Sequence, residues 1–183
     1  SRCSKNALEG CSRCSGNACD PHNRGSGPIK PNQPIVFDCF PRSSKTGYHA
    51  DMSRTVLKGK ASKKVRHLWD TVLEGQQLGC DLVHAGVNGA KVHQAIMDFF
   101  EEQGYKTERK KSGWVGFFHG TGHGIGLDLH EPPWIGKKRD LILPEGTVVT
   151  VEPGLYYPGL GGVRIEDMVL VTKKGCRNLA KMP

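Results

Sequence analysis

The sequence contains no long apolar run, no internal repeat and no low-complexity segment. A membrane-spanning helix needs about 20 mostly apolar residues, so a transmembrane protein is not expected. The missing repeat argues against a solenoid. The first residues hold neither a starting methionine nor the apolar stretch of a secretory signal. We therefore expect a cytoplasmic protein with no membrane partner.

Acidic residues are scarce relative to basic ones, at 18 against 26, which gives a formal net charge of +8. Lysines and arginines that neutralise phosphates are the main source of nonspecific affinity for nucleic acids. Here the positive charge is dispersed, with its densest groups at residues 58–66, 106–111 and 137–139. Aromatic residues do not interleave these groups as a stacking platform would require. The charge predicts a solvated surface, and no nucleic-acid partner is expected.

Seven cysteines are an odd number, and four of them lie within the first nineteen residues: Cys3, Cys11, Cys14 and Cys19. The Cys11-x-x-Cys14 pair resembles half of a zinc site. A structural zinc usually needs a second close pair of cysteines or histidines, which is missing. Reduced, incidental thiols are therefore preferred over a zinc knuckle. The length of 183 residues fits one domain, which we expect to span residues 1–183.

Alternating apolar patterns predict strands, then two helices, then further strands. Residues 34–40 and 48–57 are extended and flank a turn-rich segment, which indicates a hairpin. Helical spacing covers residues 61–79, with Gly79 as its stop, and a second helix begins at the cap Asn88 and ends at Gly104. Extended segments follow at residues 115–119, 147–152 and 162–171. This order predicts an α+β domain whose helices cover one face of a mainly antiparallel sheet.

Acidic residues stand inside the apolar segments. Asp38, Glu152 and Glu166 each belong to one of three such segments. A buried carboxylate without a partner is costly, so each must be paired, protonated or bound to a cation. Separate buried salt bridges would need three bases, and only Arg164 is close in sequence, on the same strand face as Glu166. The hairpin also returns Asp51 to the side of Asp38.

Three histidines accompany the carboxylates. His119, His123 and His130 lie in a glycine-rich segment, residues 118–131, that allows close backbone approach and convergence of imidazoles. A lone histidine is more often a core or surface residue, but this clustering favours a site role. Four carboxylates and one neutral imidazole would balance two divalent cations. The set therefore predicts a two-metal hydrolytic centre with Mn²⁺ first, and with Co²⁺, Zn²⁺ or Fe²⁺ as alternatives.

These motifs resemble the pita-bread metallopeptidases, which comprise methionine aminopeptidases, aminopeptidase P and prolidase. The resemblance runs from about Cys14 to Pro183, and five residues fall on the ligand positions in the family's order. It implies a curved, mainly antiparallel sheet covered by helices, apparently without the family's amino-terminal helices. The implied metal ligands are Asp38, Asp51, His123, Glu152 and Glu166.

The resemblance also implies roles for individual residues. Asp38 and Glu166 would bridge the metals, Asp51 would complete one site, and His123 with Glu152 would complete the other. Glu152 would in addition carry protons. The remaining catalytic and substrate-binding residues implied are His22, His119, His130 and Arg164.

Residues 152–159 and 162–167 look more like those of prolidases and aminopeptidase P than those of methionine aminopeptidases. The predicted activity is hydrolysis of Xaa-Pro bonds at peptide amino termini or in dipeptides, so a peptide is the expected substrate. A methionine aminopeptidase, a metal-free creatinase-like hydrolase, an inactive binding module and a truncated remnant are the alternatives. Missing helices would expose an apolar sheet face, and such a face favours association. A homodimer is therefore also a prediction.

Overall fold

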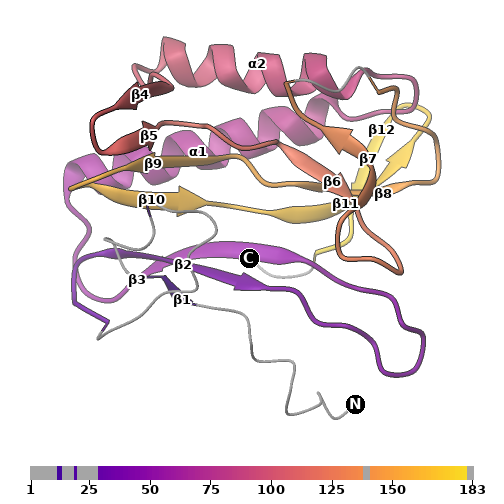
Figure 1. Ribbon diagram of the computed structural model, residues 1–183, viewed down its shortest axis with the longest axis horizontal. Helices are drawn as coiled ribbons and strands as arrows, with labels where there is room; N and C mark the ends of the chain where they lie inside the picture. Colours follow the sequence, from indigo (N-terminus) through magenta and orange to yellow (C-terminus); the bar gives the residue numbers. More distant parts are fainter. Residues whose placement is uncertain (1–11, 14–18, 20–28, 138–140, 181–183) are drawn as a thin grey trace.

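The computed structural model describes residues 12–13, 19, 29–137 and 141–180. In this part of the chain, two helices lie together on one side of a set of antiparallel strands (Figure 1). The α+β prediction is confirmed, as is the mainly antiparallel pairing. Every strand pair recorded among the described residues is antiparallel.

The predicted hairpin forms from β2 (Pro34–Cys39) and β3 (Met52–Leu57), with the short β1 (Ser12–Arg13) on the other edge of β2. Its register places Asp38 opposite Ser53. The connecting segment folds back on itself through a bridge between Arg42 and His49. It thereby brings Asp51, directly before β3, to the end of β2 that carries Asp38.

The two helices are α1 (Lys63–Leu82) and α2 (Gly89–Glu102). The Ser62 and Asn88 side chains cap them by accepting hydrogen bonds from the backbone amides of Val65 and Ala90. The prediction that Gly79 ends the first helix is wrong, because α1 continues through it. A Cβ on Gly79 would lie 2.8 Å from a Val151 methyl group, so close packing against the sheet explains this glycine.

A five-stranded sheet in the order β12-β11-β8-β6-β7 lies against the helices. Its members are β6 (Gly122–Gly124), β7 (Glu131–Ile135), β8 (Val148–Val151), β11 (Asp167–Thr172) and β12 (Gly175–Asn178). Two small ribbons complete the strands: β4 (Glu108–Lys110) with β5 (Gly113–Val115), and β9 (Gly154–Tyr157) with β10 (Gly161–Arg164).

The sequence pattern misplaced several of these strands. The segment expected at residues 115–119 shares only Val115 with β5. The one expected at residues 162–171 divides into β10 and β11, because Ile165 and Glu166 leave the ladder between them. The strands β6, β7, β9 and β12 were not predicted, since they are short and rich in glycine, proline or polar residues.

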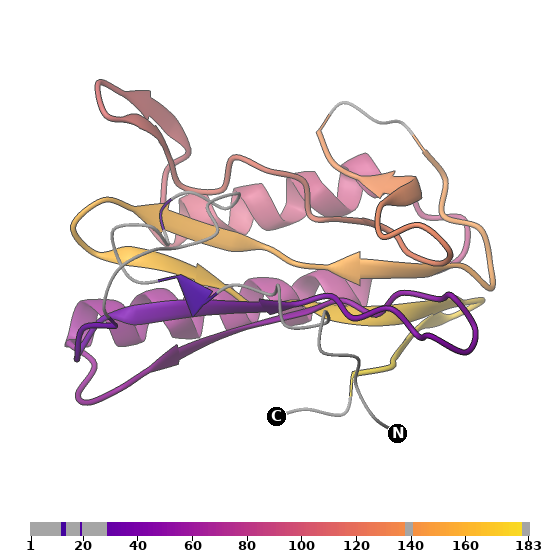
Figure 2. The same cartoon turned by 60° about the horizontal axis from the view of Figure 1, so that its bottom comes forward.

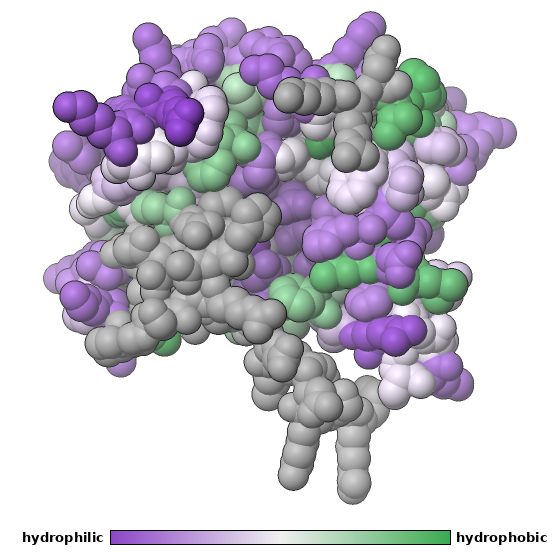
Figure 3. Space-filling view, in the orientation of Figure 1, coloured by the Kyte–Doolittle hydropathy of each residue, from purple (hydrophilic) through white to green (hydrophobic). Residues whose placement is uncertain are grey.

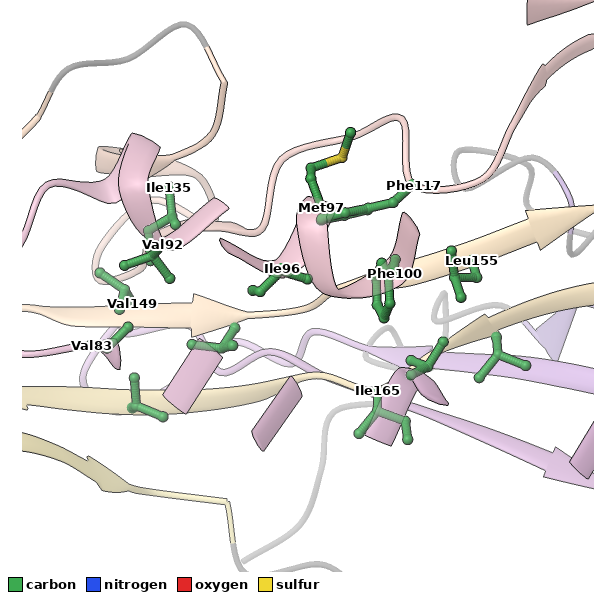
Figure 4. Packing of buried hydrophobic residues seen from close by; sticks show 14 of the residues in the cluster. Val83, Val92, Ile96, Met97, Phe100, Phe117, Ile135, Val149, Leu155 and Ile165 are labelled. Atoms are coloured by element: carbon green, nitrogen blue, oxygen red, sulfur yellow. The ribbon is translucent and has the colours of Figure 1, made fainter. Parts of the chain in front are cut away.

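The apolar core lies between the helices and the sheets (Figure 4). Val92, Ile96 and Phe100 of α2 face Val149 and Leu155 of the strands, and all five are buried. Full burial of one such side chain stabilises the fold by about 1.5–3 kcal/mol. This core fixes the strands whose ends carry the predicted ligands.

On the face shown in Figure 3, apolar residues form small groups separated by hydrophilic ones. Phe37, Val56 and Leu73 are among the exposed apolar side chains. Neither helix of the described part is long and apolar enough to cross a membrane. The view in Figure 2 shows the β2–β3 hairpin as a layer on the far side of the β9–β10 ribbon from α2.

Candidate metal centre

The five predicted ligands come from five separate places in the fold. Asp38 lies in β2, Asp51 directly before β3, and His123 in the short β6. Glu152 directly follows β8, and Glu166 lies in the break between β10 and β11. Glu152 and Glu166 were expected inside strands and instead stand at strand ends, where their backbone amides donate to the carbonyl oxygens of Thr121 and Ser53.

These side chains converge. One oxygen each of Asp38, Asp51 and Glu166 lie within 4.8 Å of one another, and so do one atom each of His123, Glu152 and Glu166. A third group of the same size joins Asp51 and His123 to His130. Because the groups share members, they form one continuous cluster.

Burial and mutual repulsion make the cluster electrostatically costly. Burial, then the charges of Glu166 and Asp38, raises the pKa of Asp51 to about 9. Burial raises the pKa of Glu166 to about 7, and burial with the charge of Glu166 raises the pKa of Glu152 well above its usual value. Such carboxylates hold protons unless positive charge replaces them.

Arg164 supplies part of that charge, since it opposes the rise in the pKa of Asp51, Glu152 and Glu166 without cancelling it. Arg164 donates to Asp38 at 2.6 Å, so Asp38 has a buried ion-pair partner. Among the described residues, no lysine or arginine nitrogen lies within 4.0 Å of a carboxylate oxygen of Asp51, Glu152 or Glu166. The alternative of separate buried salt bridges therefore accounts for one of the four carboxylates.

The imidazole of His123 is oriented as a metal ligand would be. Its Nδ1 lies 3.0 Å from the carbonyl oxygen of Gly124, which can only accept, so Nδ1 carries the proton. The unprotonated Nε2 then faces Glu152 at 3.4 Å and Asp51 at 3.8 Å. Burial lowers the pKa of His123 to about 4, which keeps the ring neutral.

A buried oxygen without a partner marks the centre of the cluster. Asp51 is 5% exposed, and its Oδ1 makes no hydrogen bond. An unsatisfied buried carboxylate oxygen costs free energy, and a cation would satisfy it. Hard oxygen donors with one imidazole are the donor set that Mn²⁺, Co²⁺, Fe²⁺ and Zn²⁺ accept. The residues present therefore fit a divalent metal pair.

Two of the predicted substrate residues, His130 and Arg164, contact this cluster. His130 is exposed, and its ring centroid lies 4.4 Å from that of His123. His119 is half-buried, and its Nε2 lies 2.9 Å from the Tyr156 hydroxyl. Arg164 contacts Asp38 as described above. His22 lies outside the described residues, as do Cys3, Cys11 and Cys14.

Two hydroxyl residues that sequence reasoning missed contact the cluster. Ser53 donates to Glu166 at 2.6 Å, and Thr150 donates to Glu152 at 3.3 Å. Each stands two positions from a predicted ligand, Ser53 after Asp51 and Thr150 before Glu152. Side chains two apart in a strand share a face, which is the signal that would have found them.

Comparison with known families decides the classification. The model of metallopeptidase family M24 matches residues 1–173. The chain belongs to this family. It is similar to the Xaa-Pro dipeptidase of Pyrococcus furiosus, with 37% identity over 134 residues, and to that of Lactobacillus helveticus, with 37% identity over 163 residues. These alignments cover 73% and 87% of this chain.

Solved structures place the M24 chain in the pita-bread fold, as expected. The prolidase from Pyrococcus furiosus superposes with a TM-score of 0.86 at 32% identity and covers 97% of this chain. An X-Pro aminopeptidase from Thermotoga maritima gives the same score at 34% identity and the same coverage of this chain. The M24 chain spans 50% and 48% of those two structures, and 36% and 41% of the two dipeptidases.

Proposed function

We propose that this chain carries the hydrolytic centre of a metal-dependent Xaa-Pro peptidase. The observation that carries the proposal is the cluster around Asp51, whose orphaned Oδ1 and raised pKa call for cations. The similarity to Xaa-Pro dipeptidases in two organisms supports the substrate class. Residues 1–183 would then act as one catalytic unit of the metallopeptidase.

Two divalent cations would be held by the five clustered side chains, with Mn²⁺ as the first choice. Asp38 and Glu166 would bridge them, Asp51 would complete one position, and His123 with Glu152 would complete the other. When bound, such a pair activates water and polarises the peptide carbonyl.

The protein's own residues supply the proton transfers and the positioning. Glu152 is 16% exposed at its side chain, so it faces both the cluster and the solvent side. Its carboxylate would take a proton from the attacking water and deliver it to the leaving nitrogen. That nitrogen is a tertiary amide in an Xaa-Pro bond, so it leaves only after gaining a proton. His130, exposed beside His123, would donate a hydrogen bond to the substrate carbonyl.

His119 would line the substrate pocket. It borders a cavity of about 680 Å³ whose wall also includes Trp114, Phe117 and Phe118. Apolar and aromatic walls suit a pyrrolidine ring, which offers no N–H group to a polar partner. Arg164 would orient the bridging Asp38 through their 2.6 Å contact.

The proposal is tested with paired peptides. We expect the chain loaded with Mn²⁺ to cleave an Xaa-Pro dipeptide and a longer Xaa-Pro peptide, but not Met-Ala peptides. Asp51→Ala should lose at least about a hundredfold in kcat/KM, because truncating a ligand removes a metal position. Lys110→Ala on the exposed β4 is the matched control and should keep full activity.

The outcomes separate the alternatives. Cleavage of Met-Ala peptides alone would replace the proposal with a methionine aminopeptidase. Binding of two metals without any cleavage would leave an inactive binding module. Failure to bind metal would contradict the proposed centre itself.

Two further proposals concern the setting of the protein. We place it in the cytoplasm, where thiols stay reduced, and the free thiols of Cys80 and Cys176 support this proposal. The homodimer stays a prediction, and light scattering coupled to size-exclusion chromatography would test it.

A further inference from the structure

Ser53 joins two of the proposed ligands through one hydroxyl group. It lies in β3 opposite Asp38 and has no exposed surface. Its Oγ lies 2.6 Å from Glu166 Oε2 and 3.2 Å from Asp38 Oδ1. Arg164 Nε donates to the same oxygen at 2.9 Å. Ser53 therefore contacts both proposed bridging carboxylates, which come from two different parts of the fold.

Thr150 has the equivalent position on the other side of the cluster. It lies in β8 and is also without exposed surface. Its Oγ1 accepts from the His123 backbone amide at 3.1 Å and donates to Glu152 Oε1 at 3.3 Å. Thr150 thus connects the two ligands that would complete a single metal position.

Each of the two hydroxyl oxygens has one partner that can only donate. An arginine Nε and a backbone N–H can only donate, so each hydroxyl oxygen must accept from that group. When the carboxylates are ionised, as metal ligands would be, the single hydroxyl proton is directed at a carboxylate. For Ser53 this is Glu166, which is nearer than Asp38, and for Thr150 it is Glu152. Each hydroxyl therefore holds one carboxylate oxygen in place and restricts rotation of that side chain.

A purely structural role would look different. Thr71 is a buried threonine of α1, and its hydroxyl donates to the carbonyl of His67 in its own helix. It touches no titratable side chain of the cluster. Ser53 and Thr150 instead direct their only hydroxyl proton at side chains that would bind metal, and they do so from different strands.

We propose that Ser53 and Thr150 are positioning residues, each orienting the ligands of one part of the metal centre. This inference rests on the proposed function, because it assigns the two hydroxyls to the same cluster. It adds that the two residues orient different pairs of ligands. Ser53 orients the pair shared by both cations, whereas Thr150 orients the pair that serves one cation.

Because the two residues orient different ligands, their substitution should change the affinities of the two Mn²⁺ equivalents differently. Loss of an outer partner of a metal ligand typically lowers metal affinity by about 10- to 100-fold. Ser53→Ala should weaken binding of both Mn²⁺ equivalents by that factor. Thr150→Val should weaken one equivalent and leave the other within about twofold of the parent chain. Thr150→Ser keeps the hydroxyl and should restore the second equivalent.

The measurement is calorimetric titration of the full chain with Mn²⁺, together with the visible absorption of the Co²⁺-loaded protein. Controls are Thr71→Val, which loses a buried hydroxyl outside the cluster, and Ser62→Ala, which loses the cap of α1. Both should bind two equivalents as the parent does. Circular dichroism checks folding, and Ser53→Cys, whose thiol is a weaker donor, replaces Ser53→Ala if that variant does not fold.

Parent-like titrations and Co²⁺ spectra for folded Ser53 and Thr150 variants would overturn the inference. Equal weakening of both equivalents by Thr150→Val, or no recovery in Thr150→Ser, would overturn the assignment of Thr150 to the ligands of one cation. A parent chain that binds two equivalents without cleaving peptides would contradict the proposed function alone. A parent chain that binds no Mn²⁺ would overturn both.

Discussion

Asp51 is the side chain that most clearly conflicts with a metal-free fold. It is buried, one of its oxygens has no partner, and burial with neighbouring charges raises its pKa to about 9. The folded state therefore holds a proton that the unfolded chain releases near about pH 4. Stability of the metal-free protein must fall as the pH rises between these two values.

The corresponding prediction concerns Asp51→Asn without metal. The parent should lose up to about 1.4 kcal/mol of unfolding free energy per pH unit through this group between about pH 5 and 8. The asparagine amide cannot ionise, so the variant should show a shallower decline and be more stable than the parent at the upper end of this range. Urea unfolding in the presence of a chelator measures both. Identical pH slopes would show that Asp51 is not the group that takes up the proton.

Within the strands, β6 shows how backbone proximity builds the site. A Cβ on Gly122 would lie 1.9 Å from the carbonyl oxygen of Thr150, which belongs to the neighbouring β8 backbone. Only glycine allows this approach, and it places His123 beside Glu152. The glycines of this segment were expected to allow close approach. At Gly122 the atom that approaches is the carbonyl oxygen of Thr150.

Gly122→Ala is expected to separate β6 from β8 and displace His123. The variant should lose at least about tenfold in Mn²⁺ affinity and about 1–3 kcal/mol of stability, because backbone atoms must move to admit the methyl group. Gly175→Ala is the control, since a Cβ there meets nothing within 4 Å. Titration calorimetry and urea unfolding test the pair. A Gly122 variant with parent-like metal affinity would contradict this explanation.

For the whole molecule, the proposed cations would join elements that are otherwise held apart by charge. The ligands come from the β2–β3 hairpin, from β6 and β8, and from the β10–β11 break. Metal bound only by the folded state stabilises it by mass action, by about 2.7 kcal/mol at a hundredfold excess over Kd. In a chain of this size, 1 kcal/mol corresponds to roughly 2–4 °C in Tm.

Removal of metal with a chelator should therefore lower Tm by about 5 to 10 °C, and added Mn²⁺ should restore it. Scanning calorimetry near neutral pH would record the change. The Asp51→Ala variant should show a smaller shift, since it lacks one ligand. A parent Tm that changes with neither chelator nor Mn²⁺ would exclude a stabilising metal centre.

The family was predicted from the resemblance of the motifs, whereas local signals in the chain were enough to predict the fold class, the hairpin and both helices. These signals are apolar periodicity, the Asn88 cap, and carboxylates placed where burial demands a partner. They also singled out the four carboxylates, because a buried carboxylate without a base points to a cation whatever the surrounding fold. The choice of His123 among three histidines came from the family resemblance. The metal-binding roles of these residues stay predictions.

How these residues meet became known only from the packing of the folded chain. Gly79 looked like a helix stop because a glycine signals flexibility in sequence, whereas its close contact with Val151 exists only after packing. Ser53 and Thr150 stand two positions from predicted ligands, but that spacing alone does not show that a serine or threonine contacts the cluster until its neighbours are known. Contacts between residues far apart in the chain, such as Ser53 with Glu166, depend on how strands are arranged. Local propensity does not encode that arrangement, and burial of the shared core establishes it.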